Sequence, residues 1–389
     1  MSGKFFREVL LKRPGSVRME EHWYTVQNVE QIDTPALLVY PERIAQNIRT
    51  MIEMVGGHTE RLIPHVKTHK MAEVVQMQLD AGIIKFKCAT IAEAEMLAST
   101  GALHVLLAYQ LTGPKINRFR ALVQAHPDTD WASLVDNYES AEELGQAFAA
   151  INRKAVIYVD VNNGMNRTGH LVNGALGQLY HDLSQDSRFD LRGFHVYDGH
   201  FRDPDFNDRK AKADEAFGQV RVVADKLERK GLLYPMMVVG GTPTFSVHAK
   251  RKDVWCSPGT CLFWDWGYAD SLPDQHFNWA ALLLTRIISK PAEGVVTTDL
   301  GHKAVAAENP LAKRVQFLNL DGYEVIGQSE EHLVLRVDDW EAVRVGDVLY
   351  GVPYHICPTV ALHDEANVIE EGRRTECWTI ASRKRRLQY

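Results

Sequence analysis

From about residue 34 the chain alternates short apolar runs with longer amphipathic ones. The run "TPALLVY" precedes "PERIAQNIRTMIEMV", in which Pro41 suits the first turn of a helix. "KFKCAT" leads into "IAEAEMLASTG", where Thr90 and Glu93 have the spacing of a capping box. This βα rhythm predicts a parallel sheet covered by helices. The strand-like runs are, in chain order, TPALLVY, RLIPHV, KFKCAT, HVLLAY, WASLVD, AVIYVDV, LRGFHVYDGH and MMVVGGTP.

Roughly eight βα units predict an α/β fold with a (β/α)₈ TIM-type barrel over residues 28–271, close to the typical length of about 250 residues. An open, doubly wound sheet is the alternative. The chain has no Gly-x-Gly-x-x-Gly after its first strand-like run, which disfavours a dinucleotide-binding version of that sheet. From residue 272 to 389, strand-like runs follow one another with short breaks and predict a separate β domain. Residues 1–27 contain no βα unit and are expected to pack with that domain.

Composition narrows the functional classes. The 389 residues are 45% hydrophobic and 24% charged, which is typical of globular proteins. A net charge of −6 offers no basic field for nucleic acid, and the terminal "RKRR" is expected to be a solvated tail. No apolar run reaches membrane-spanning length, and the charged N-terminus is unlike a signal peptide. Five scattered cysteines without a Cys-x-x-Cys predict reduced thiols in the cytoplasm.

The stretch "PHVKTHK" concentrates nitrogen at the end of an expected barrel strand, where catalytic groups gather. Apolar neighbours and nearby histidines would disfavour the ammonium form of Lys67, as a Schiff-base lysine requires. A solvated loop lysine is the alternative. His65 and His69 suggest a metal site only weakly, because no third ligand lies near them in the sequence.

Two glycine-rich turns fit a phosphate site. "VVGGTPT" places Gly240, Gly241 and Thr242 after an apolar strand, and "CSPGT" places Gly259 and Thr260 at a second turn. The last two βα loops of a barrel often bind phosphate through such backbone N–H groups. Glycines that only form turns are the alternative.

"PYHICPTV" is the sharpest local signal. In a strand, His355 and Cys357 would share one face. Imidazole with thiolate suits zinc or a similar transition metal, and two protein ligands leave positions open for water or substrate. A buried cysteine beside a hydrogen-bonded histidine is the alternative.

These motifs, together with "DTPALLVY", "KFKCATIAEAEML", "HVYDGH" and "GGTPTF", resemble the D-threonine aldolase and D-serine dehydratase family from about Asp33 to Leu362. Its members are fold-type III pyridoxal-phosphate enzymes related to alanine racemase. The whole pattern is closest to the D-threonine aldolase branch.

The resemblance implies a set of roles. Lys67 forms the Schiff base with the cofactor, Arg167 lies below it and Tyr197 helps to hold it. The phosphate-binding residues are Gly240, Gly241, Thr242, Gly259 and Thr260. His355 and Cys357 bind a divalent metal, zinc or manganese, with magnesium, cobalt and nickel as further options. A homodimer acting on a small β-hydroxy-D-amino acid is expected.

The implied reaction is the cleavage of D-threonine and related β-hydroxy-D-amino acids to glycine and an aldehyde. Dehydration to a 2-oxo acid and ammonia is the alternative, because the resemblance associates a cysteine at position 357 with the dehydratases and an aspartate with the aldolases. A racemase has no use for a metal pair. A single-domain pyridoxal-phosphate carrier does not account for the β domain.

Overall fold

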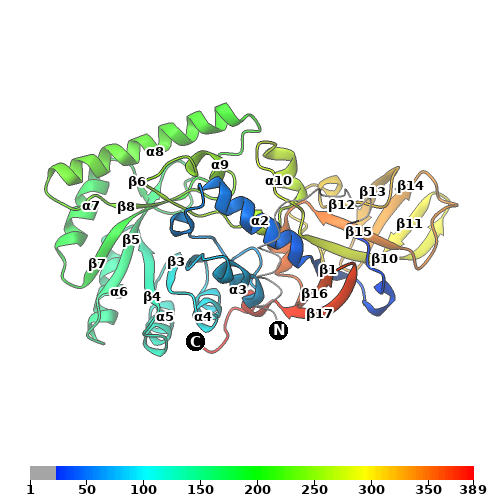
Figure 1. Ribbon diagram of the computed structural model, residues 1–389, viewed down its shortest axis with the longest axis horizontal. Helices are drawn as coiled ribbons and strands as arrows, with labels where there is room; N and C mark the ends of the chain where they lie inside the picture. The colour runs from blue at the N-terminus through cyan, green and yellow to red at the C-terminus, as the bar shows by residue number, and fades with distance from the viewer. Residues whose placement is uncertain (1–22) are drawn as a thin grey trace.

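The computed structural model describes residues 23–389 and contains two sheets (Figure 1). The first is parallel, and its strands form the barrel. They are β2 (Lys85–Cys88), β3 (His104–Gln110), β4 (Asp130–Val135), β5 (Ala155–Asn162), β7 (Phe189–Val196), β8 (Met236–Val239) and β9 (Trp255–Cys256), with β6 (His170–Leu171) beside β5.

The segment of residues 62–66 closes this sheet into a ring. On one side the Ile63 N–H donates to the Cys256 carbonyl at 2.9 Å, and on the other the Val66 N–H donates to the Lys87 carbonyl at 2.9 Å. The segment therefore lies between β9 and β2 in the position of an eighth parallel strand. The predicted (β/α)₈ barrel is confirmed.

Helices cover the outside of the barrel. Pro41 occupies the first turn of its helix as predicted. Thr90 caps the helix at Ile91 by accepting the Glu93 N–H, whereas the Glu93 carboxylate accepts from the Ala89 N–H and Lys70. The helices are α2 (Pro41–Met54), α3 (Ala72–Asp80), α4 (Ile91–Ser99), α5 (Pro114–Ala125), α6 (Tyr138–Ala149), α7 (Gly174–Gln185), α8 (Phe206–Arg229), α9 (Phe245–His248) and α10 (Trp266–Ser271).

The prediction that the barrel series begins at "TPALLVY" is wrong. Strand β1 (Ala36–Val39) pairs antiparallel with β10 (Ala281–Ala292) and parallel with β16 (Glu365–Glu370), so it belongs to the second sheet. All four of its residues are buried. A short, fully buried apolar strand has the same sequence pattern in a barrel and in the middle of another sheet.

The second sheet runs in the order β13-β14-β11-β10-β1-β16-β17, with β12 and β15 paired off this path. Trp23 onwards packs against it: the Val26 N–H donates to the Tyr350 hydroxyl at 3.1 Å. The remaining expected N-terminal residues, 1–22, lie outside the described part. The other elements are β11 (Val295–Thr298), β12 (Val315–Phe317), β13 (Tyr323–Gln328), β14 (Leu333–Val337), β15 (Val348–Pro353), α11 (Ile356–Val360) and β17 (Arg373–Thr379).

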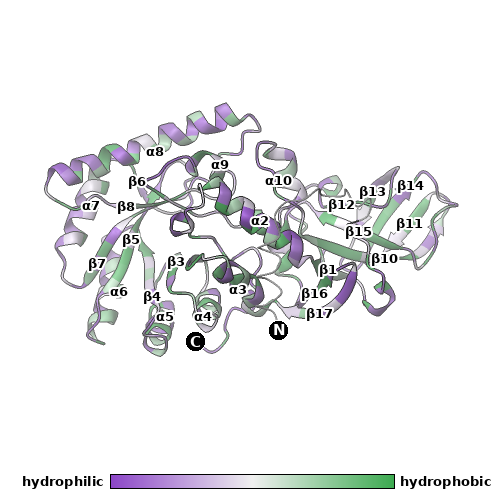
Figure 2. Cartoon of the chain, viewed as in Figure 1, coloured by the Kyte–Doolittle hydropathy of each residue, from purple (hydrophilic) through white to green (hydrophobic). Residues whose placement is uncertain are grey.

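Hydropathy follows this architecture (Figure 2): the barrel strands are largely apolar, and the long α8 is largely polar. No helix within residues 23–389 is long and apolar enough to cross a membrane. Residues 384–386 of the terminal basic run are exposed as expected. Arg383 is not free, because its Nε donates to the Ala361 carbonyl at 3.0 Å.

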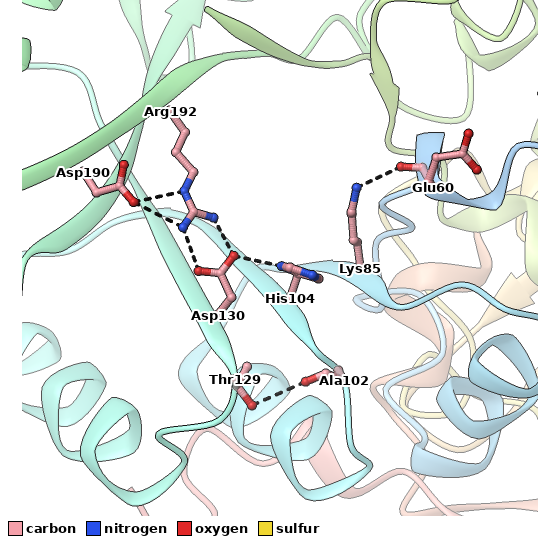
Figure 3. A network of polar contacts seen from close by, with 8 residues as sticks. All are labelled: Glu60, Lys85, Ala102, His104, Thr129, Asp130, Asp190 and Arg192. Carbon is pink, nitrogen blue, oxygen red and sulfur yellow. Dashed lines mark hydrogen bonds and ion pairs between the residues drawn. The ribbon is translucent and has the colours of Figure 1, made fainter.

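The N-terminal end of the barrel carries an ionic network (Figure 3). Arg192 binds both oxygens of Asp130, at 2.5 and 2.9 Å, and Asp130 also accepts from His104 at 2.8 Å. Lys85 donates to the Glu60 carbonyl at 3.0 Å. These partners tie strand starts together, and this end of a barrel ordinarily serves stability.

Candidate active site

Lys67 follows the segment of residues 62–66 that closes the barrel. It therefore lies at the C-terminal end of the barrel, where the catalytic groups of such barrels lie. It is half-buried, and no carboxylate among the described residues forms an ion pair with it. Lys70, three residues later, instead pairs with the buried Glu93 of α4. Of the two lysines in "PHVKTHK", Lys67 is therefore the one available for chemistry.

The two histidines of this stretch have structural roles. The Nδ1 atoms of His65 and His69 each accept a backbone N–H two residues later, from Lys67 and Met71, both at 3.2 Å. Burial lowers the pKa of His69 to about 3 and that of His65 well below its ordinary value. Both imidazoles are therefore neutral, and they hold the turn that presents Lys67.

The first glycine-rich turn follows β8. Gly240 has a φ of +72°, and a Cβ at Gly241 would lie 2.8 Å from Cε2 of Tyr197. Within the described residues, the backbone N–H groups of Gly241 and Thr242 have no hydrogen-bond partner. These two donors and the nearby Thr242 hydroxyl are the groups that a phosphate uses.

The second turn is tied to the first. The Thr242 hydroxyl accepts the N–H groups of Gly259 and Thr260, each at 3.1 Å. A Cβ at Gly259 would lie 2.7 Å from the His65 carbonyl oxygen, so this position requires glycine. The structure thus brings both predicted turns together, beside the segment that carries Lys67.

Tyr197 and Arg167 also meet. Strand β7 ends at Val196, so Tyr197 lies at the barrel mouth, and the Arg167 guanidinium lies 4.8 Å from the centroid of its ring. Sequence reasoning missed a third group beside this ring, Lys87 of β2, whose Nζ lies 5.6 Å from the same centroid. Together the turns, Lys67, the tyrosine and the cations fit a planar, phosphorylated cofactor.

The prediction that His355 and Cys357 lie on a strand is wrong. Strand β15 ends at Pro353, and His355 is the residue immediately before the short α11. Pro358 explains the difference, because proline fits the first turn of a helix but cannot donate to a central strand ladder. The two side chains still lie close enough to interact, since each shifts the pKa of the other.

Cys357 reaches the barrel mouth. Its Sγ lies 3.1 Å from the Thr68 hydroxyl and 3.4 Å from the Thr260 hydroxyl. Thr68 is the residue after Lys67, and Thr260 belongs to the second glycine-rich turn. The thiol therefore joins three of the predicted site segments.

Neighbouring groups lower the pKa of the Cys357 thiol. Burial raises the pKa of Cys357, but the hydrogen bond from His355 and the charge of Lys67 outweigh burial and bring the pKa to about 7. Burial likewise lowers the pKa of His355, whereas the contact with Cys357 raises it to about 9. At neutral pH the pair is an imidazolium beside a partly ionised thiol.

Two carboxylates that sequence reasoning missed hold this segment. Buried Asp265, whose pKa burial raises to about 6, accepts the Ile356 N–H at 3.0 Å. Glu308 accepts from Nδ1 of His355 at 2.6 Å, which leaves Nε2 for a metal. A carboxylate on the second nitrogen is the usual partner of a metal-binding histidine.

The donor chemistry of His355 and Cys357 thus fits a divalent metal such as zinc, bound by two protein ligands with positions left open. Among residues 23–389, no cluster of three or more His, Cys, Asp or Glu side chains is arranged to hold a metal.

A hollow of about 720 Å³ lies away from this site, at the N-terminal end of the barrel. Met54, Arg61, Met236 and Trp255 are among its lining residues, and none of the predicted site residues is. The convergence of side chains, rather than the size of a cavity, locates the candidate site.

Residues 39–265 match the family model described as alanine racemase, N-terminal domain. The chain belongs to this family. A second model, described as putative serine dehydratase domain, matches residues 280–369 of this alanine racemase family member. The resemblance inferred from the motifs and the alanine-racemase-like fold are both confirmed.

Named relatives cover nearly all of the chain. It is 27% identical to a 3-hydroxy-D-aspartate aldolase from Paracoccus denitrificans, over 91% of this chain and 92% of the relative. It is also 27% identical to a D-threonine aldolase from Arthrobacter, over 91% and 93%. A D-threo-3-hydroxyaspartate dehydratase from Delftia is 24% identical, over 89% and 97%. The crystal structure of D-threonine aldolase from Filomicrobium marinum superposes with a TM-score of 0.83 at 25% identity, over 90% and 96%.

Proposed function

We propose that this chain is a pyridoxal-phosphate- and divalent-metal-dependent lyase that cleaves D-threonine and related β-hydroxy-D-amino acids to glycine and an aldehyde. One observation carries the proposal: Cys357 contacts the residue after Lys67 and a residue of the second glycine-rich turn. A metal-binding pair, a Schiff-base lysine and a phosphate seat therefore converge at one barrel mouth. The aldolases among the relatives support the reaction class.

When bound, pyridoxal phosphate supplies an electron sink that stabilises negative charge at the substrate Cα. Lys67 binds the cofactor through Nζ, and Gly241 and Thr242 bind its phosphate through their backbone N–H groups. Tyr197, which has the Arg167 guanidinium on its ring, would border the cofactor and orient it. With cofactor and substrate bound, the Lys67 amine would be placed to move a proton at Cα.

His355 and Cys357 are the proposed metal ligands, and a Lewis acid there would lower the pKa of the substrate β-hydroxyl. Glu308 orients His355, and Asp265 holds the backbone between the ligands. In cleavage, the hydroxyl loses its proton, the Cα–Cβ bond breaks, and Cα gains a proton. A metal held on one side of the lysine would select one configuration at Cα, and the names of the relatives support the D-configuration.

A second function, dehydration to a 2-oxo acid and ammonia, is favoured by Cys357 itself, because thiolate is the ligand that the motif comparison associates with dehydratases. In that reaction Lys67 removes the α-proton and the β-hydroxyl leaves. A dehydratase also occurs among the relatives.

A product assay separates the two reactions. Metal-loaded enzyme is incubated with D-threonine, and glycine with acetaldehyde is measured against 2-oxobutyrate with ammonia. Glycine and acetaldehyde are expected in equal amounts, with L-threonine as the control substrate left intact. Oxo acid and ammonia as main products would establish the dehydratase, and equal turnover of L-threonine would overturn D-specificity.

The proposal also covers the oligomeric state and the cellular compartment of the protein. A homodimer follows from the motif resemblance. The five cysteines are all free in the described residues, which supports the proposed reducing cytoplasm.

A further inference from the structure

A buried ammonium group lies below the proposed phosphate seat. Lys87 of β2 is only 2% exposed. Its Nζ crosses the barrel to the Ser257 hydroxyl and to Nε2 of His195, the latter at 3.3 Å. His195 lies on β7 and Ser257 follows β9, and β8 lies between these two strands. The ammonium group is therefore placed beneath the end of β8, where the turn of Gly240 begins.

The contacts of Lys87 with its neighbours are with uncharged groups. Nδ1 of His195 donates to Asp160 at 2.7 Å, so Nε2 is the unprotonated nitrogen that accepts from Lys87. Burial lowers the pKa of His195, which keeps the imidazole neutral. Within the described residues, no carboxylate forms an ion pair with Lys87, because Asp160 is separated from it by the imidazole ring.

This arrangement is costly without an anion. Burial, reinforced by the charge of Lys67, lowers the pKa of Lys87 to about 7, although the more distant carboxylates of Asp160 and Asp198 act in the opposite direction. A buried charge is ordinarily paired, because removing it from water is costly, and a buried amine without an anion loses its proton more readily. The fold nevertheless places two hydrogen-bond partners, Ser257 and His195, around this ammonium group. The same Ser257 hydroxyl donates to the Gly240 carbonyl at 3.2 Å. Ser257 thus links Lys87 to the glycine-rich turn that is proposed to bind the phosphate.

We propose that Lys87 is a cofactor-positioning residue whose ammonium group provides the buried positive charge for the phosphate of pyridoxal phosphate. The inference rests on the proposed function, since it takes the anion to be that cofactor's phosphate. The substrate carboxylate is the other anion of the site. The depth of Lys87 and its link to the Gly240 turn favour the phosphate.

The test compares pyridoxal phosphate with pyridoxal, which lacks the phosphate. Binding of each to apoprotein is measured by absorbance titration for wild type, Lys87→Met and Lys87→Gln. Both variants are expected to bind pyridoxal phosphate at least tenfold more weakly and pyridoxal within about threefold of wild type. Lys87→Gln keeps a polar group for Ser257 and His195, so it reports on charge if Lys87→Met folds poorly.

Lys85→Met is the matched control. Lys85 lies on the same strand two residues earlier, at the N-terminal end of the barrel, where it lies over Trp255. Its replacement should leave both affinities unchanged. Urea unfolding of the apoprotein adds a second readout, because a Lys87→Met variant relieved of a lone buried charge should be no less stable than wild type.

Four outcomes would overturn the inference: unchanged binding of pyridoxal phosphate, an equal loss for both ligands, a marked loss of apoprotein stability in both variants, or unchanged cofactor binding with a raised KM for D-threonine. The last result would assign the charge to the substrate carboxylate. If wild type bound neither ligand, the proposed function itself would fail, and this is distinguishable because the variants would then have nothing to lose.

Discussion

Substitutions of the two lysines in "PHVKTHK" should have different effects: replacing Lys67 should abolish activity, and replacing Lys70 should lower stability. Lys70 pairs with Glu93, whose side chain is 1% exposed, so Lys70→Ala leaves a buried carboxylate without its cation. Removing one partner of a buried pair costs about 3–5 kcal/mol of unfolding free energy. Lys67 has no such partner, and Lys67→Ala should change stability by no more than about 0.5 kcal/mol.

The backbone conformation at Lys70 adds a second contribution to the loss of stability in Lys70→Ala, which can be measured separately. Lys70 has a φ of +56°, in the left-handed region. Lys70→Gly should therefore be more stable than Lys70→Ala by roughly 1 kcal/mol, although both lose the ion pair. Adding Glu93→Gln to Lys70→Ala should recover part of the loss, because the buried group is then uncharged.

Urea unfolding of each apoprotein gives the free energies, and cofactor absorbance gives occupancy. Lys67→Ala is expected to lose the absorbance band of the lysine-bound cofactor and all turnover, while Lys70→Ala keeps the band. A lost band in Lys70→Ala with unchanged stability would refute the assignment of Lys67. Equal stability of the Ala and Gly variants would refute the reasoning from φ.

Two further predictions concern the metal pair. Chelation should abolish activity and leave the cofactor band intact, and Cys357→Asp should restore activity best with a harder ion such as manganese; full activity of metal-free protein would contradict the proposal. In metal-free protein, the rate of Cys357 alkylation should rise with pH through about 7, because deprotonation creates the nucleophile. His355→Ala should move this midpoint upward, and an unmoved midpoint would exclude the ion pair.

The repeating part of the fold was predictable because its signals are local. Pro41 and Thr90 mark helix starts that depend on adjacent residues only, and both are where the sequence places them. Strand β1 was assigned to the wrong sheet because pairing partners such as Leu283 are distant in the chain and leave no mark on a four-residue apolar run.

The candidate site divides in the same way. Lys67 and the glycine turns belong to contiguous motifs and are found from sequence. Lys87, Asp265 and Glu308 were missed because each acts through a contact with a segment far along the chain. A lysine in an apolar strand and a proline at position 358 were the available signals: the first marks a buried charge, and the second argues against a strand.

The position of β1 has a consequence for the reaction. β1 lies between β10 and β16 in the second sheet, and α2 of the barrel layer begins two residues after it, at Pro41. Asp265, at the end of the barrel, accepts the backbone N–H of Ile356 at the start of α11. The proposed metal ligands are thus fixed relative to Lys67 by two connections, neither of which contains a long linker. In the proposed mechanism, the bond that breaks depends on where the β-hydroxyl is held relative to Lys67. The packing of the second sheet against the barrel would then contribute to the choice between cleavage and dehydration, together with the proposed ligand Cys357.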